Sequence, residues 1–139
     1  MKTIEAFKKI MNEQTEIALA TSVEEIPNVR IVNFFYDETK KCLFFSTFKE
    51  NKKITEFQKN PNVAFTTIPN EQVNHVRVHD AQVKKSELSV YDVAEQWIQK
   101  IPSYEENIKL AGAMLDLYEI HFGEAIVILG IDSRETIIL

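Results

Sequence analysis

The feature that most constrains the fold of this chain is a succession of short segments rich in β-branched and aromatic residues. Examples are "VRIVNFFY" at 29–36 and "EAIVILGI" at 124–131, which suit a pleated, half-buried strand better than a helix. Several follow one another through short turn-like links such as "DETK" at 37–40, which favour antiparallel pairing. We expect strands at 17–22, 29–36, 42–46, 62–68, 74–85, 117–122, 124–131 and 135–139.

Helical spacing of apolar residues is confined to a few segments. We expect a helix from Thr3, acting as N-cap, to about Met11, and a second one that Asn51 caps and Asn60-Pro61 stops. A third region runs from 89 to about 101 and restarts after Pro102, where "SYEE" resembles a capping box. So few helices among so many strands predict a mainly β domain with peripheral helices, in the form of a small barrel.

Length, composition and charge limit the number of domains and the classes of partner that the chain can attract. A chain of 139 residues with 45% hydrophobic content can bury one core, so residues 1–139 are expected to form a single domain. Its formal charge of −5 gives no general attraction to nucleic acid or to an anionic membrane. The N-terminus lacks a signal-peptide pattern and no segment approaches the roughly 20 apolar residues of a membrane span, so we expect a cytoplasmic protein.

The stretch "STFKENKK" (46–53) concentrates lysines where an apolar strand gives way to a helix. The three glycines of the chain form neither a dinucleotide-binding motif nor a P-loop, so side chains would have to hold any phosphate. Asn51, Lys52 and Lys53 would occupy the cap and first turn of the helix, where unpaired backbone N–H groups attract anions. A solvated lysine-rich loop is the alternative interpretation.

Arg30 is the second cation of interest, because it shares a strand face with Val32, Phe34 and Tyr36. An arginine on a core strand requires an anionic partner, and a guanidinium group suits phosphate. Pairing with an Asp or Glu side chain is the alternative interpretation.

Other chemistry finds little support in the sequence. His75 and His79 lie about 13 Å apart along one strand face and cannot easily share a metal ion. No cluster of ligand spacing surrounds His121, and the single cysteine, Cys42, excludes a disulfide within the chain and a cysteine-based zinc cage. We therefore expect no metal site, name no catalytic residue, and interpret Trp97 as a core or interface anchor.

Four stretches carry a resemblance to a known family: "LAT" (19–21), "IPNVRIV" (26–32), "CLFFSTFKENKKITEFQKNPNVAF" (42–65) and "HVRVHDAQV" (75–83). In this order they resemble the FMN-binding split-barrel family related to pyridoxamine 5′-phosphate oxidase, and the closing segment from 117 is similar to the ends of its short members. The resemblance implies a six- to eight-stranded antiparallel split β-barrel. It also implies a homodimer with flavin at the interface, each site being completed by the other protomer.

The resemblance implies FMN contacts position by position. Arg30 and the triplet at 51–53 would hold the phosphate, the backbone after Arg30 would follow the flavin ring, and His75 would approach the flavin. The implied cofactor-binding residues are Arg30, Ile31, Val32, Asn33, Ser46, Thr47, Asn51, Lys52, Lys53 and His75. The family's substrate-phosphate positions fall near Phe35, Trp97 and Ile101, which carry no matching side chains, so we expect FMN binding without pyridoxamine-phosphate oxidase activity.

Three functional hypotheses follow from this resemblance. The first is an FMN-dependent oxidoreductase that transfers hydride or electrons between a donor such as a reduced nicotinamide and a small acceptor. The second is a non-catalytic flavin-binding or sensing module. The third is the same scaffold binding deazaflavin F420 or haem.

Overall fold

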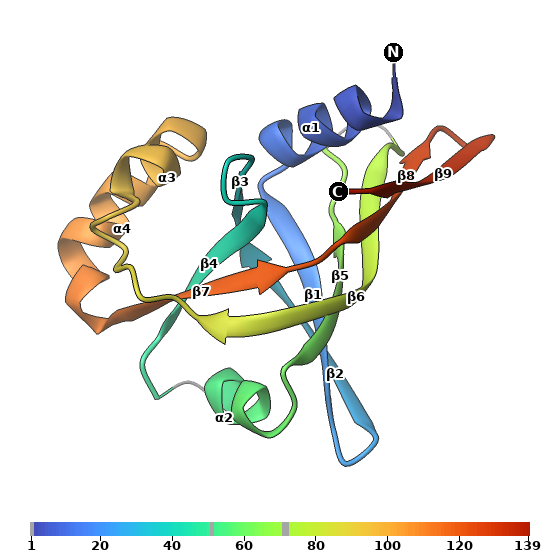
Figure 1. Ribbon diagram of the computed structural model, residues 1–139. Helices are drawn as coiled ribbons and strands as arrows, with labels where there is room; N and C mark the ends of the chain where they lie inside the picture. The colour runs from blue at the N-terminus through green and yellow to red at the C-terminus, as the bar shows by residue number, and fades with distance from the viewer. Residues whose placement is uncertain (1, 51, 71–72) are drawn as a thin grey trace.

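The computed structural model describes residues 2–50, 52–70 and 73–139. Its elements, in chain order, are α1 (Thr3–Glu13), β1 (Glu16–Val23), β2 (Ile26–Asn33), β3 (Phe35–Asp37), β4 (Cys42–Phe48), α2 (Lys52–Lys59), β5 (Asn62–Thr67), β6 (His75–Lys85), α3 (Ala94–Lys100), α4 (Tyr104–Ala111), a 3-10 turn (Gly112–Met114), β7 (Leu115–His121), β8 (Glu124–Leu129) and β9 (Ser133–Ile138) (Figure 1).

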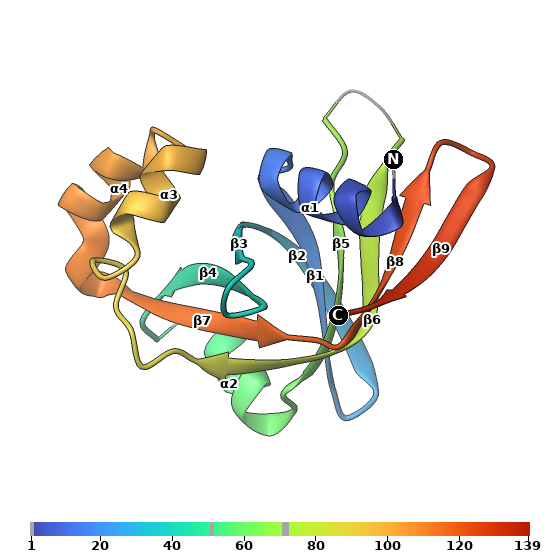
Figure 2. The same ribbon diagram turned by 45° about the horizontal axis from the view of Figure 1, so that its top comes forward.

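All strand pairs in the sheet are antiparallel, and the order is β2-β1-β5-β6-β7-β4-β3. The sheet forks at β6: residues 75–77 pair with β8, which carries β9, whereas residues 82–85 pair with β7. This fork gives the curved, split sheet seen in Figures 1 and 2. The prediction of a mainly β, antiparallel split barrel with peripheral helices is confirmed.

The described residues contain nine strands, one more than the upper end of our expectation. The reason is Phe34, where the expected strand 29–36 divides into β2 and β3. Its backbone N–H donates to the Thr15 carbonyl at 3.0 Å, and its side chain is completely buried. The chain leaves the β1 ladder at this point and continues as the partner of β4.

Two expected helix starts are wrong in detail. Lys2, not Thr3, is the N-cap of α1, and the Thr3 hydroxyl donates to Glu135 of β9 instead. Ser103 has helical backbone angles and makes no capping hydrogen bond, so the expected capping box does not form. The third helical region is shorter than expected, because Ser89 N–H and its hydroxyl bond the Asp92 carboxylate in a turn before α3 begins.

Two hydrophobic clusters support the two parts of the molecule. One fills the barrel and includes Phe7 of α1 and Phe45 of β4, whereas the other joins β3, β4 and β7 to α3 and α4 through Trp97. Trp97 is completely buried and stacks on Tyr104, with ring centroids 4.2 Å apart, which supports its interpretation as a core anchor. In Figures 1 and 2, α3 and α4 stand beside β4 and β7, while α1 and α2 lie at opposite ends of the barrel.

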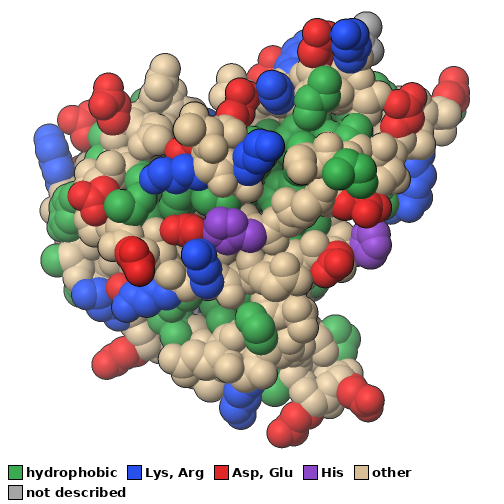
Figure 3. Space-filling view, viewed as in Figure 1, with side chains coloured by type: hydrophobic (Ala, Val, Ile, Leu, Met, Phe, Trp, Pro, Cys, Tyr) green, Lys and Arg blue, Asp and Glu red, His purple; other side chains and the backbone are tan. Residues whose placement is uncertain are grey.

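No helix among the described residues is long and apolar enough to cross a membrane. Figure 3 shows acidic and basic side chains intermixed on the face that carries β6 and β7. The described residues on this face therefore form no continuous cationic surface, in keeping with the negative net charge.

Candidate functional site

Arg30 of β2 is held by polar side chains from two neighbouring elements. Its Nη2 donates to Glu56 Oε2 on α2 at 2.8 Å, and its Nη1 donates to Thr21 Oγ1 on β1 at 3.0 Å. Glu56 also accepts hydrogen bonds from Thr21 and from Asn28 Nδ2, the latter at 3.1 Å. The alternative partner that the sequence left open, a carboxylate, is therefore present.

The electrostatics of this group stabilise the charged form of Glu56. The pKa of Glu56 falls from 4.5 to about 2, because the Thr21 hydrogen bond, followed by those from Arg30 and Asn28, outweighs the opposing effect of burial. Arg30 and Glu56 are mostly shielded from water, with side chains 18% and 13% exposed.

Lys53 lies three residues before Glu56 on α2, so the two side chains share a helix face. Burial lowers the pKa of Lys53, the charge of Arg30 lowers it further, and Glu56 partly offsets both. The positive charges of Arg30 and Lys53 thus act on each other in a half-buried place, where a bound anion would relieve their repulsion. Asn51 lies outside the described residues, and of Lys52 the structure describes only the backbone at the start of α2.

A cavity of about 570 Å³ opens beside Lys53. Its lining comes from β2, β4, α2, α4 and the start of β7: Ile31, Val32, Ser46, Thr47, Phe48, Lys53, Tyr104, Asn107, Leu110, Ala111 and Leu115. Ser46 Oγ and Tyr104 OH are 2.7 Å apart and tie β4 to α4 across this lining. The fold therefore brings five predicted residues, namely Ile31, Val32, Ser46, Thr47 and Lys53, into one cavity.

The other predicted residues have different positions. Arg30 lies next to Lys53 but does not line the cavity, and Asn33 is exposed at the end of β2. His75 lines a second, larger cavity. The cavity wall from α4 was missed by sequence reasoning: Tyr104, Asn107 and Leu110 form no motif, and the packing of Tyr104 on Trp97 sets their position.

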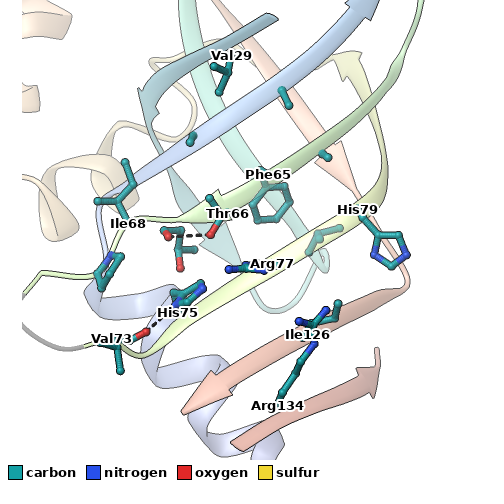
Figure 4. Close-up of a pocket in the computed structure, with 16 residues that line it drawn as sticks. Val29, Phe65, Thr66, Ile68, Val73, His75, Arg77, His79, Ile126 and Arg134 are labelled. Atoms are coloured by element: carbon teal, nitrogen blue, oxygen red, sulfur yellow. Dashed lines mark hydrogen bonds between the residues drawn. The ribbon is translucent and has the colours of Figure 1, made fainter. Parts of the chain in front are cut away.

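The second cavity, of about 930 Å³, lies on the outer face of β1, β5 and β6. Its floor has small side chains, Ala18, Ala20 and Ala64. Figure 4 shows His75, Arg77 and His79 along β6, with Arg134 on β9 nearby. His75 Nδ1 lies 2.6 Å from the Val73 carbonyl oxygen, which fixes the ring orientation.

Apolar side chains stand exposed along β2, between the two cavities. Val29 is 63% exposed and lines the larger cavity, whereas Ile31 is 60% exposed and lines the smaller one. Phe48 and Leu110, at the rim of the smaller cavity, are 52% and 76% exposed. A group of large exposed apolar residues around a cavity is typical of a ligand or protein contact surface.

Comparison with known proteins identifies the family. The pattern of the family described as pyridoxamine 5′-phosphate oxidase-like matches residues 10–134. The chain belongs to this family. The family resemblance expected from the sequence is therefore confirmed, over nearly the whole chain.

Solved structures of proteins with low sequence identity to this chain share its fold. General Stress Protein 26 of Bacillus anthracis strain Sterne is 19% identical, with all of both chains covered and a TM-score of 0.74. An FAD-binding protein of Mesorhizobium loti is 16% identical, with 90% of each chain covered and a TM-score of 0.64. The haem storage protein HutZ of Vibrio cholerae is 15% identical, with 99% of this chain and 95% of that chain covered and a TM-score of 0.69. A search of curated proteins gives no match.

Proposed function

We propose that this family member binds FMN in the smaller cavity and acts as an oxidoreductase. One observation carries the proposal: residues from β2, β4 and α2 that are distant in sequence converge on a single cavity beside the Arg30–Lys53 pair. Its volume of about 570 Å³ lies within the range of small-molecule sites.

The cationic end of this site suits the phosphate. Arg30 uses two N–H groups for Thr21 and Glu56 among the described residues, and a guanidinium group carries further donors. A phosphate near Lys53 would offset the repulsion between Lys53 and Arg30. We infer that the buried Thr47 hydroxyl, which lines the cavity, orients the bound group.

The remaining walls suit the flavin ring. Ile31, Val32, Leu110 and Leu115 offer apolar contact, which also excludes water from the site. β2 stands at one end of the strand order, so its outer backbone N–H and C=O groups have no strand partner in the described sheet and can bond polar ring atoms. Bound FMN would supply hydride or electron transfer, and the chain's residues would hold and orient it.

We propose further that two protomers pair across the exposed face of β2. Val29 and Ile31 would be buried by such pairing, and His75, which lines the larger cavity and not the smaller one, would approach the flavin of the other protomer. Ile31→Asp should shift the protein toward monomers in analytical ultracentrifugation and weaken FMN binding. The control is Ile131→Asp, since Ile131 is 95% exposed and lines neither of these cavities. An equal sedimentation profile for both variants would contradict the pairing.

Pyridoxamine-phosphate oxidase activity does not fit the residues present. At the positions where the family grips its substrate phosphate, Phe35 and Trp97 are buried with ring centroids 4.7 Å apart, in an edge-to-face arrangement. Neither side chain carries a charge and both are shielded from solvent, so neither offers the contact that a substrate phosphate requires. We therefore propose a different, small acceptor for the flavin electrons.

Haem in the larger cavity is the second candidate function. The neighbour HutZ stores haem, and here His75, Arg77 and Arg134 line a cavity of about 930 Å³. If His75 Nδ1 donates to the Val73 carbonyl, Nε2 is left with the lone pair that an iron ion needs. The two arginines could pair with the propionate groups.

Reconstitution with each cofactor tests these functions. We expect purified protein to bind FMN, and Lys53→Ala to weaken binding by roughly 10-fold or more, as for the loss of a hydrogen bond to a charged group. Lys49→Ala is the matched control, because Lys49 lies in the same lysine-rich stretch, exposed and outside the cavity lining. Unchanged FMN affinity in both Lys53→Ala and the Lys52/Lys53 double alanine variant would overturn the assignment.

Activity and absorption separate the remaining alternatives. NAD(P)H oxidation that depends on added FMN would distinguish an oxidoreductase from a flavin-binding module. A Soret band without flavin binding, lost in His75→Ala, would instead support the haem function.

A further inference from the structure

Three side chains with metal-binding atoms meet at the end of β4 away from the smaller cavity. Cys42 Sγ, a carboxylate oxygen of Glu119 and a ring nitrogen of His121 all lie within 4.8 Å of one another. His121 Nε2 is 2.7 Å from Glu119 Oε1. The proposed flavin site uses none of the three residues.

The strand ladder explains why they meet. In the antiparallel pairing of β4 with β7, Cys42 is directly opposite His121, and Phe44 is opposite Glu119. Glu119 and His121 are two residues apart on one strand, so both project from the same face of the sheet. Ligands on paired strands are held more precisely than ligands on loops.

A neighbouring hydroxyl holds the carboxylate in place. Ser86 Oγ donates to Glu119 Oε2 at 2.6 Å, which leaves Oε1 directed at His121. Such a bond from outside the ligand set is common in protein metal sites, where it orients a ligating carboxylate.

We propose that Cys42, Glu119 and His121 bind one divalent transition metal ion, and that Zn²⁺ is the ion that fits best. Zinc accepts thiolate, imidazole and carboxylate ligands, often as three protein groups with water in the fourth position. The thiolate disfavours Mg²⁺ and Ca²⁺, which prefer oxygen ligands. The ion would enter past His121, whose side chain is 41% exposed.

Binding requires local changes, and one of them is loosening of the ion pair in which Lys84 Nζ lies 3.9 Å from Glu119 Oε1. Tetrahedral coordination places nitrogen and oxygen ligand atoms about 3.3 Å apart, so the 2.7 Å contact between His121 and Glu119 has to widen slightly. The thiol proton of Cys42 leaves to solvent when sulfur binds the ion. Burial, followed by the charge of Glu119, raises the pKa of Cys42 to about 12, so the metal has to displace this proton.

The same three residue types could form a nucleophilic thiol with a base and an orienting carboxylate. Burial argues against that role, because Cys42 is only 1% exposed and a substrate could not approach its sulfur. A single ion is small enough to bind between the three side chains without such access.

Titration of metal-free protein with Co²⁺, a spectroscopic substitute for Zn²⁺, tests the site without any flavin. We expect one Co²⁺ per chain and a sulfur-to-cobalt charge-transfer band, which must come from Cys42 because it is the only cysteine. Zn²⁺ should displace the cobalt. Cys42→Ser should abolish the band, His121→Gln should weaken Co²⁺ binding at least about 10-fold, and Ser86→Ala should weaken it by roughly 10- to 100-fold.

His79→Gln is the control, since His79 is exposed on β6 and belongs to no such cluster of described residues. It should bind Co²⁺ as the unaltered chain does. Circular dichroism of each metal-free variant checks that the fold is retained. The proposal is overturned if folded protein gives no charge-transfer band, or if His121→Gln binds Co²⁺ as tightly as His79→Gln.

Discussion

Replacing Glu56 with Gln tests the polar group that anchors Arg30 to α2. The substitution keeps the size of the side chain but removes the charge that Arg30, Thr21 and Asn28 stabilise. The lowering of the Glu56 pKa from 4.5 to about 2 corresponds to roughly 3 kcal/mol of stabilisation. The side chain is 13% exposed and Gln retains part of the hydrogen bonding, so we expect a loss of about 1–3 kcal/mol.

The loss of unfolding free energy in Glu56→Gln should depend on pH in a defined direction. A carboxylate whose pKa is lowered by folding stabilises the protein above its unfolded-state pKa, and this contribution disappears as pH falls through the folded-state pKa. The difference between the two proteins should therefore be constant near neutral pH and shrink as pH falls from about 4.5 toward about 2. For 139 residues, the loss at neutral pH corresponds to a decrease in Tm of roughly 3–9 °C.

Urea unfolding followed by the fluorescence of Trp97, the only and fully buried tryptophan, measures this difference. Glu124→Gln is the control, because Glu124 is exposed on β8 and its side chain makes no hydrogen bond or ion pair with the described residues. FMN should stabilise Glu56→Gln more than the unaltered protein, since the carboxylate no longer competes for Arg30. A variant within about 0.5 kcal/mol of the unaltered protein at neutral pH, or a loss that persists unchanged into acid, would refute the reasoning.

Two further predictions concern stability. Glu24 and Glu25 form the β1–β2 turn with φ of 52° and 68°, a backbone conformation that Asn and Gly adopt more readily than Glu. Replacing them with Asn and Gly should raise the free energy of unfolding, measured by urea titration, by roughly 1–2 kcal/mol. An unchanged free energy of unfolding would show that this turn is not strained. Burial lowers the pKa of Lys100 from 10.5 to about 7, so stability should rise with pH between these values. Lys100→Met should abolish that rise, and an identical pH profile would show that the bond to the Met11 carbonyl and the contact with Phe34 keep the amine charged.

The local sequence pattern was sufficient to predict most of the helices and strands. The strand segments were recognisable because β-branched and aromatic residues alternate over short spans, and the Asn60-Pro61 stop matches the end of α2 at Lys59. The division at Phe34 was not predictable in this way, since it depends on a hydrogen bond to Thr15 and on burial in the barrel.

The candidate site was predictable only in part. The lysine stretch and Arg30 stand out in an acidic chain, and the family resemblance assigns both to the phosphate site, so their residues could be named from the sequence. The partner of Arg30 could not be named, because Glu56 lies on another element and nothing in its local sequence distinguishes it from other exposed-helix carboxylates. The wall from α4 depends in the same way on the packing of Tyr104 against Trp97.

Cys42 and His121 show most clearly the difference between what local sequence predicts and what depends on the fold. Their local sequence predicts a strand at each position, no cluster of ligand spacing surrounds His121, and a single cysteine excludes a cysteine-based zinc cage, so no metal site was expected. Cys42 and His121 face each other only in the folded chain, because the register of β4 against β7 pairs residues from distant parts of the sequence. Strand formation follows from local side-chain preference, whereas register follows from burying one face of every strand in a common core.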